Sequence, residues 1–330
     1  MLNEKITVLD HYYVELNNGC LGVVVGNTHF TGFIIGYIKY CPTNKETIWK
    51  KENVYYERIV KIYSPQSVRV STPTQTYIHC YDSYVPVIYN AEVSKIYDPV
   101  VRTRKIEYRV RDELEERVLG IIYFLLHSGV EDGIGVTGSI LPGIHNPRHS
   151  DIDLVVYGWK NSMDVIEYIE ENKSLFKPFR GERLKRWIES NSTATGLPGK
   201  SVLKLYRNWR RGIFDGVEYS IIYNDGIYRI GEECTAWKTI GSTVIEAHVG
   251  GGLEALNYPS IGRIEEWKHV EGMIPKSDVV EVVSFNALFT SFLYDGGRGL
   301  IKGLLQHDPL RDVYRVLVGG IESPGYIMPL

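Results

Sequence analysis

The 330-residue sequence lacks several features that would place it in a specialised class of protein. It contains no run of 18 apolar residues, so we expect no membrane-spanning helix. Its start, MLNEKITVLDHYYVELNNG, lacks the apolar core of a signal peptide. There is no low-complexity tract, and 44% hydrophobic residues with 23% charged residues are typical of a globular chain. The net charge of −3 excludes a general polyanion binder, so any basic surface must be local.

Cysteine is also scarce. The four cysteines, Cys20, Cys41, Cys80 and Cys234, are far apart in sequence and form no C-x-x-C pair. This spacing predicts neither a zinc site nor a disulfide framework. A cytoplasmic location is therefore expected, because the cytoplasm keeps thiols reduced.

The most informative stretch is residues 134–158, IGVTGSILPGIHNPRHSDIDLVVYG. Asp151 and Asp153 open a hydrophobic run that reads as a strand. Alternation then places both carboxylates on one face, about 6–7 Å apart. Two like charges so close repel each other, and a bound divalent cation would offset that repulsion. Mg²⁺ prefers oxygen ligands and is usually held by one or two carboxylates together with substrate phosphates.

Gly138 and Ser139 precede the aspartates, and eleven residues separate Ser139 from Asp151. Glycine lets a backbone approach a ligand closely, and the following amides and hydroxyl can donate to phosphate oxygens. A phosphate-binding turn beside a pair of metal-binding aspartates suits the transfer of a nucleotide from a triphosphate.

This combination resembles the signature of the DNA polymerase β-like nucleotidyltransferase superfamily, including its stand-alone, archaeal-type members. The match covers about 20 residues and specifies Gly138, Ser139, Asp151 and Asp153 within an apolar frame. The alternative is an Asx turn leading into an ordinary strand with solvated aspartates. The resemblance implies Mg²⁺ or Mn²⁺ as cofactor and a nucleoside triphosphate such as ATP as substrate.

Residues 1–104 are expected to form a mainly-β domain. Short runs rich in Val, Ile, Tyr and Thr alternate with turn signals, which is typical of an antiparallel barrel or sandwich. The expected strands are Leu21 to Val25, Phe33 to Tyr40, Arg58 to Tyr63, Ser67 to Val70 and Tyr84 to Tyr89. Its aromatic residues favour a strand core over a base-stacking platform for single-stranded nucleic acid.

Residues 105–223 are expected to form the nucleotidyltransferase domain. Apolar residues spaced three and four apart predict a helix over 107–128, followed by a strand at Ile134 to Thr137. A second helix is predicted from Ser162, and a strand over 216–223. Relatives often supply a third metal-binding carboxylate from this last strand, so Glu218 is the first candidate and Asp215 the second.

The chain has one strong concentration of positive charge. Residues 177–211 contain ten Lys or Arg against two Glu, a local excess of +8. Lys200, Lys204, Arg207 and Arg211 follow a helical period and predict a cationic stripe on one helix. We expect Lys204, Arg207 and Arg211 to bind phosphates. The alternative is a solvated face.

Residues 224–330 return to strand periodicity and predict a mainly-β, barrel-like C-terminal domain. Strands are expected at Thr243 to His248, Val279 to Phe285, Gly299 to Leu305 and Val313 to Val318. The expected fold is therefore an α/β (α+β) nucleotidyltransferase core with a mixed sheet, flanked by two mainly-β barrel-like domains.

The expected function is transfer of NMP from an NTP to an acceptor hydroxyl, with release of pyrophosphate. Asp151, Asp153 and Glu218 would hold the metal, and Gly138 and Ser139 would hold the phosphates. Flanking barrels favour an RNA or tRNA end as acceptor, with a protein hydroxyl as a second option. The alternative is a non-catalytic nucleotide- or nucleic-acid-binding module on a degenerate core.

Overall fold

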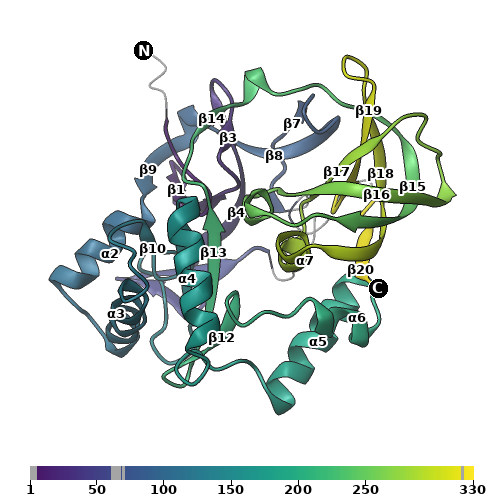
Figure 1. The fold of residues 1–330 in the computed structure, drawn as a ribbon. Coiled ribbons are helices and arrows are strands. Elements are labelled where there is room, and N and C mark those ends of the chain that lie inside the picture. The colour runs from purple at the N-terminus through teal and green to yellow at the C-terminus, as the bar shows by residue number, and fades with distance from the viewer. Residues whose placement is uncertain (1–5, 61–67, 69–70, 321–322) are drawn as a thin grey trace. The chain divides into compact units, whose positions relative to one another are not determined.

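A computed structural model describes residues 6–60, 68, 71–320 and 323–330 of the chain. It is a mixed α+β protein containing a curled half-barrel sheet, a mixed sheet with helices and a closed five-stranded β-barrel (Figure 1). The chain divides into two compact units, each discontinuous in sequence. The first comprises residues 1–61, 87–179 and 207–229, and the second 62–86, 180–206 and 230–330. Within the described residues, none of the helices could cross a membrane.

The curled sheet belongs mainly to the first unit and follows the order β5-β6-β4-β2-β1-β9. Its strands are β1 (Tyr13–Leu16), β2 (Leu21–Val24), β4 (Phe33–Thr43), β5 (Trp49–Lys51), β6 (Val54–Arg58) and β9 (Val93–Tyr97), with the two-residue β3 (Thr28–His29) beside them. The end of β8 (Ser83–Tyr89) pairs with β4. The predicted strands at 21–25, 33–40 and 84–89 are confirmed. Of the strand predicted at 58–63, Arg58 is the last residue of β6, residues 59 and 60 lie outside a strand, and residues 61–63 lie outside the described part of the chain. Residues 61–67 and 69–70, including most of the strand predicted at 67–70, lie outside the described part of the chain.

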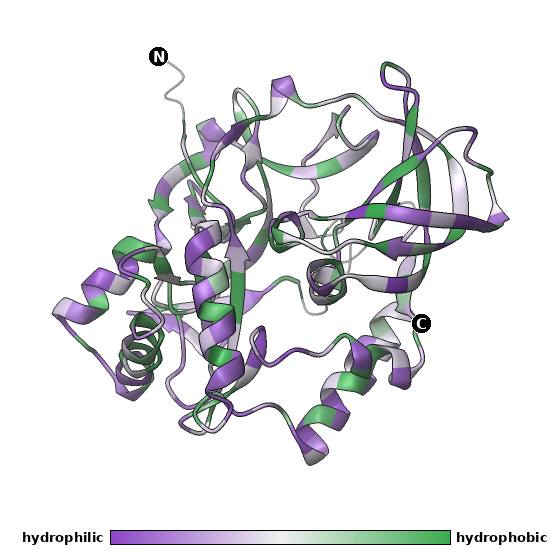
Figure 2. Cartoon of the chain, in the orientation of Figure 1, coloured by the Kyte–Doolittle hydropathy of each residue, from purple (hydrophilic) through white to green (hydrophobic). Residues whose placement is uncertain are grey.

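The mixed sheet of the first unit follows the order β10-β11-β13-β12. Its strands are β10 (Ile134–Val136), β11 (Ile152–Tyr157), β12 (Arg211–Phe214) and β13 (Val217–Asn224), and the helices near it are α2 (Pro99–Tyr108), α3 (Glu113–Leu126) and α4 (Trp159–Glu171). Strands β11 and β13 are parallel neighbours, while β10 and β12 pair antiparallel with them. Helix α4 buries Val165, Ile166 and Ile169 as predicted, and hydrophobic and hydrophilic bands alternate along it (Figure 2).

The helix predicted over 107–128 is confirmed as α3 from Glu113 to Leu126, but its predicted start is wrong, because Glu107 and Tyr108 belong to a separate helix, α2. Arg109 is extended and ends α2. The Asp112 carboxylate then accepts hydrogen bonds from the amides of Leu114 and Glu115, both at 3.0 Å, and so starts α3. A side chain that caps the first free amides defines a helix start. The predicted apolar positions from Leu114 to Leu125 are nevertheless buried in α3.

The second unit contains the closed barrel. Its strands are β15 (Lys238–Val249), β16 (Ser260–Gly272), β17 (Val279–Ser284), β18 (Gly297–Asp308) and β19 (Val313–Val318), with β20 (Tyr326–Pro329) added on β18. The order is β15-β16-β17-β19-β18, and pairing of β18 with β15 closes the barrel. Only the β17–β19 pair is parallel, and the short helix α7 (Thr290–Asp295) lies between β17 and β18 in sequence.

Other elements complete the second unit. They are α5 (Gly181–Thr195), α6 (Gly199–Lys204), β7 (Gln75–Ile78) and the start of β8, and β14 (Arg229–Ile230) lies where the two units adjoin in sequence. Val202 and Leu205 join the barrel core, which includes Ile245, Phe289 and Val316. The four predicted C-terminal strands are confirmed, whereas β16, α5 and α7 were not expected.

The expectation that the cysteines form no disulfides is wrong. Cys20 is joined to Cys41, and Cys80 to Cys234. Spacing in sequence says little here, because strand pairing brings the sulfurs together. Cys20 and Cys41 flank Leu21 and Tyr40, which are direct partners on β2 and β4.

Candidate functional site

Asp151 directly precedes β11 and Asp153 is its second residue, so both carboxylates lie on one face of the sheet. Ile152 and Leu154 alternate with them and are fully buried. The partner of Asp153 on β13 is Ser220. The Ser220 hydroxyl donates a hydrogen bond to Asp153 Oδ1 and so fixes one oxygen of that carboxylate. The other oxygen, Oδ2, points towards the turn at Gly138.

The turn at Gly138 and Ser139 lies directly against Asp153. The Thr137 amide donates to the Asp153 carbonyl at 2.8 Å, which extends the pairing of β10 with β11. Gly138 has φ +63°, and a Cβ atom built on it would lie 2.1 Å from Asp153 Oδ2. Only glycine fits so close to the carboxylate in this conformation. The Ser139 hydroxyl is 3.4 Å from the Ser150 hydroxyl. The fold therefore brings together the four residues of the sequence signature.

The two carboxylates repel each other. The negative charge of Asp153 raises the pKa of Asp151 from 3.8 to about 6, and desolvation adds to this effect. The positive charges of Arg211 and Lys39 act in the opposite direction. Lys39 comes from β4 of the curled sheet, and nothing in its local sequence indicates that it approaches the aspartates.

Of the two candidates for a third carboxylate, only Glu218 shares the face of the aspartates. It lies two residues before Ser220 on β13, so strand alternation points it to the same side as Asp153. Continuing the register places it beside Asp151, on strands about 5 Å apart. Asp215 instead forms the turn between β12 and β13, five residues from Ser220, or roughly 16 Å along the strand. There it lies 3.4 Å from Arg117 Nε.

The predicted cationic helix is wrong. Helix α6 ends at Lys204, Arg207 lies in a turn, and Arg211 begins β12. The reason is a tight hairpin: Asp215 and Gly216 both have positive φ, and they connect Phe214 to Val217. An Asp-Gly pair between two short strands is a strong hairpin signal, so the sequence did contain this information.

The three residues predicted to bind phosphates lie in different parts of the structure. Arg211 pairs with Ser220 across β12 and β13, so it lies on the aspartate face. Arg207 belongs to the same unit, and its carbonyl accepts from the amides of Arg210 and Arg211. Lys204 belongs to the second unit.

The loop between Ser139 and Asp151 is anchored on the curled sheet. Leu141 and Ile144 are buried in a cluster with Tyr13, Leu21 and Tyr40. The Lys50 amide of β5 also donates to the Ile144 carbonyl at 2.9 Å. The apolar residues of this loop thus attach the Gly138–Ser139 turn to a second sheet.

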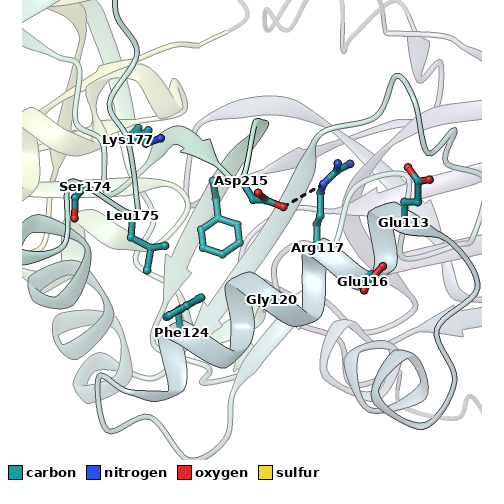
Figure 3. Close-up of a pocket in the computed structure, with 10 residues that line it drawn as sticks. Glu113, Glu116, Arg117, Gly120, Phe124, Ser174, Leu175, Lys177 and Asp215 are labelled. Carbon is teal, nitrogen blue, oxygen red and sulfur yellow. Dashed lines mark ion pairs between the residues drawn. The ribbon is translucent and has the colours of Figure 1, made fainter.

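A pocket of the first unit is separate from this site. It has a volume of about 820 Å³ and lies between α3 and the β12–β13 hairpin (Figure 3). Its lining residues are Glu113, Glu116, Arg117, Gly120, Phe124, Ser174, Leu175, Lys177, Phe214 and Asp215. None of the residues of the sequence signature is among them.

A second group of possible metal ligands in the first unit is already engaged. Asp112, Glu115 and His145 converge, with His145 Nε2 2.9 Å from Asp112 Oδ2. The Glu115 carboxylate, however, is paired with the Arg102 guanidinium and accepts from the Arg111 amide. Asp112 caps α3. The contacts of these residues therefore stabilise the start of α3.

No protein-family model, curated protein or solved structure matches this chain.

Proposed function

We propose that the chain is a metal-dependent nucleotidyltransferase that moves NMP from an NTP to an acceptor hydroxyl and releases pyrophosphate. The observation that carries the proposal is the close packing of the Gly138 turn against Asp153, with Asp151 beside it. A mixed sheet that carries both carboxylates and has helices beside it is consistent with a polymerase β-like core.

The donor set fits Mg²⁺ or Mn²⁺. Asp151, Asp153 and Glu218 offer carboxylate oxygens from one sheet face, and the raised pKa of Asp151 reflects a negative field that a cation would relieve. A bound metal would neutralise the phosphates and lower the pKa of the acceptor hydroxyl. The residues of the chain itself mainly provide position and charge.

Three groups of the first unit suit a triphosphate. Ser139 and the amides after Gly138 can donate to phosphate oxygens, and Arg211 adds a positive charge on the same face. Lys39 adds another positive charge close to Asp151. Phosphate binding by Arg207 and Lys204 stays a prediction. The acceptor is proposed to be an RNA end, including tRNA, with a protein hydroxyl as the second option.

The test is incubation of the protein with each α-³²P-labelled nucleoside triphosphate, Mg²⁺ or Mn²⁺, and cellular RNA plus protein extract. We expect label on RNA or on a polypeptide. Asp153→Asn should lower labelling by on the order of a thousandfold or more, because a neutral amide cannot replace the metal ligand. The matched control is Asp164→Asn, which removes an aspartate paired with Lys160 on α4 and should keep full activity. A fully active Asp153→Asn variant would refute the assignment.

One observation favours a second candidate, a non-catalytic nucleotide-binding module. The direct partner of Asp153 on β13 is Ser220, so a third carboxylate depends on Glu218 alone. Triphosphate binding without any labelled product would support the module. Labelling that is lost in Glu218→Gln but retained in Asp215→Asn would support the enzyme.

A further inference from the structure

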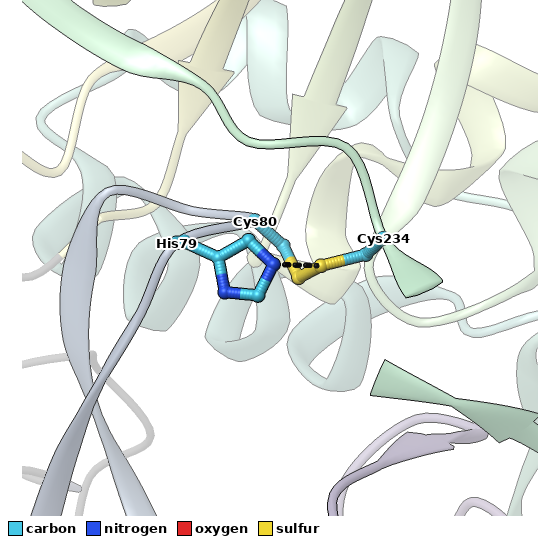
Figure 4. Close-up of side chains that lie close together, drawn as sticks. All are labelled: His79, Cys80 and Cys234. Atoms are coloured by element: carbon cyan, nitrogen blue, oxygen red, sulfur yellow. Dashed lines mark hydrogen bonds between the residues drawn. A yellow bond between two sulfur atoms is a disulfide. The ribbon is translucent and has the colours of Figure 1, made fainter. Parts of the chain in front are cut away.

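A cluster of sulfur and imidazole groups lies in the second unit, independent of the carboxylate site. His79 and Cys80 occupy the turn between β7 and β8, and Cys234 follows a short 3-10 helix (Gly231–Glu233). Their donor atoms all lie within 4.8 Å of one another, and His79 Nε2 is 3.4 Å from Cys234 Sγ (Figure 4). Cys80 is buried, whereas His79 and Cys234 are half-buried and accessible from solvent.

The backbone around these donors is held by hydrogen bonds within the same unit. The Trp237 amide donates to the His79 carbonyl at 3.1 Å. The Arg315 guanidinium of β19 donates to the Cys80 carbonyl, and its positive charge favours thiolates over thiols nearby. The Gly231 carbonyl lies 3.7 Å from Cys80 Sγ. The donors therefore stand on elements that the barrel fixes, as a preformed site requires.

We propose that His79, Cys80 and Cys234 bind one Zn²⁺ when the disulfide is reduced. Zn²⁺ takes tetrahedral nitrogen and sulfur ligands, and its bond lengths place an imidazole nitrogen about 3.6 Å from a thiolate sulfur. The 3.4 Å between His79 and Cys234 already meets this requirement. The two sulfurs need only move apart to about 3.8 Å, the separation of two thiolates on one Zn²⁺.

The chemistry balances in two steps. A dithiol reductant gives two electrons and two protons to the Cys80–Cys234 disulfide and closes into its own disulfide. Binding of Zn²⁺ to the two thiols and His79 then releases the two thiol protons. No further His, Cys, Asp or Glu of the described residues joins this group, so water takes the fourth position. The β7–β8 turn and the segment before β15 would thus be joined by the disulfide in oxidising conditions and by Zn²⁺ in reducing conditions.

The test titrates the full-length protein with Co²⁺, whose visible absorption reports tetrahedral thiolate ligands. The protein is compared as oxidised and after reduction with a phosphine, which becomes the phosphine oxide. We expect one Co²⁺ per reduced chain, displaced by Zn²⁺, and no thiolate complex in the oxidised chain. His79→Ala keeps both cysteines and should weaken binding at least tenfold.

The matched control is the Cys20→Ser/Cys41→Ser double variant, which removes the other disulfide and should bind Co²⁺ as the reduced wild type does. Absence of a thiolate complex in the reduced wild type would overturn the proposal. So would unchanged affinity in His79→Ala, or loss of the complex in the Cys20→Ser/Cys41→Ser control.

Discussion

Asp151 and Arg315 are both charged groups on sheet strands or at their ends, yet their surroundings differ in kind. Arg315 is buried in the second unit, where burial lowers its pKa to about 10. Its Nε donates to Gln306 at 2.8 Å, its Nη1 lies 3.5 Å from Glu281, and its guanidinium lies 4.1 Å from the Trp237 ring centroid. Asp151 of the first unit is exposed, and the strongest influence on it is another carboxylate.

The difference separates a charge that its surroundings compensate from a charge that lies beside a like charge. The charge on Arg315 is compensated by hydrogen bonds, an ion pair and an aromatic face, as buried charges in stable folds are. The charge on Asp151 meets a like charge, and the fold gains nothing from this arrangement by itself. Local repulsion that the fold could easily avoid is the physical reason for the cation site proposed above.

The largest effect is expected at the compensated charge. Arg315→Met should lower the free energy of unfolding by about 3–5 kcal/mol, because it leaves a partly buried Glu281 and other acceptors without their donor. The matched control is Arg298→Met on β18, whose ion pairs with Glu246 and Glu266 are exposed. It should cost about 0–1 kcal/mol. Urea unfolding measures both values, and equal losses would show that the Arg315 network is not structural.

The features that could be predicted from the sequence are those that depend on local patterns. The face shared by Asp151 and Asp153 follows from strand alternation, and the nearby Gly-Ser turn is a local pattern. The environment of Arg315 is not local, because Glu281 reaches it through pairing of β17 with β19 and Cys80 reaches it from the β7–β8 turn. Lys39 escaped prediction for the same reason, since it reaches the aspartates through the packing of one sheet on another.

Other errors arose where local patterns compete. Strand β16 was missed because charged residues interrupt its apolar alternation, as in Arg263–Glu266, while pairing with β15 and β17 holds it extended. The cationic stripe was predicted wrongly because Arg211 pairs with β13 as part of a strand, although its spacing from Lys200, Lys204 and Arg207 fits a helix. The localisation in the cytoplasm stays a prediction, although two disulfides are more typical of an oxidising compartment.

A substitution at Gly138 tests the proposed site directly. Gly138→Ala should lower labelling and Mn²⁺ affinity by roughly a hundredfold, because its Cβ would displace the Asp153 carboxylate. The matched control is Gly196→Ala, where φ is +73° and no atom lies within 4 Å of the added Cβ. It should cost about 1–2 kcal/mol of stability through backbone strain and leave labelling unchanged. Equal activity in the two variants would show that the contact with Asp153 is unimportant.

The smallest effect tests whether the repulsion at Asp151 is real. The folded-state pKa of about 6 lies above the ordinary value of 3.8, so the folded protein holds this proton more tightly than the unfolded chain. Ionising Asp151 therefore costs stability as the pH rises from about 4 to 6, and the full cost remains above pH 6. Asp151→Asn cannot ionise. It should gain about 1 kcal/mol at pH 8, a value discounted for solvent screening, and nothing below pH 4.

Thermal unfolding at pH 8 and pH 3.5 measures this gain. Asp164→Asn on α4 is the control, and because its carboxylate is paired with Lys160 it should show no gain at either pH. Mg²⁺ should stabilise the wild type at pH 8 by relieving the same repulsion, and it should stabilise Asp151→Asn much less. If Asp151→Asn is instead less stable than the wild type at pH 8, Arg211 and Lys39 already compensate the pair. The contrast with Arg315 would then disappear, and with it the physical reason to expect a cation at this site.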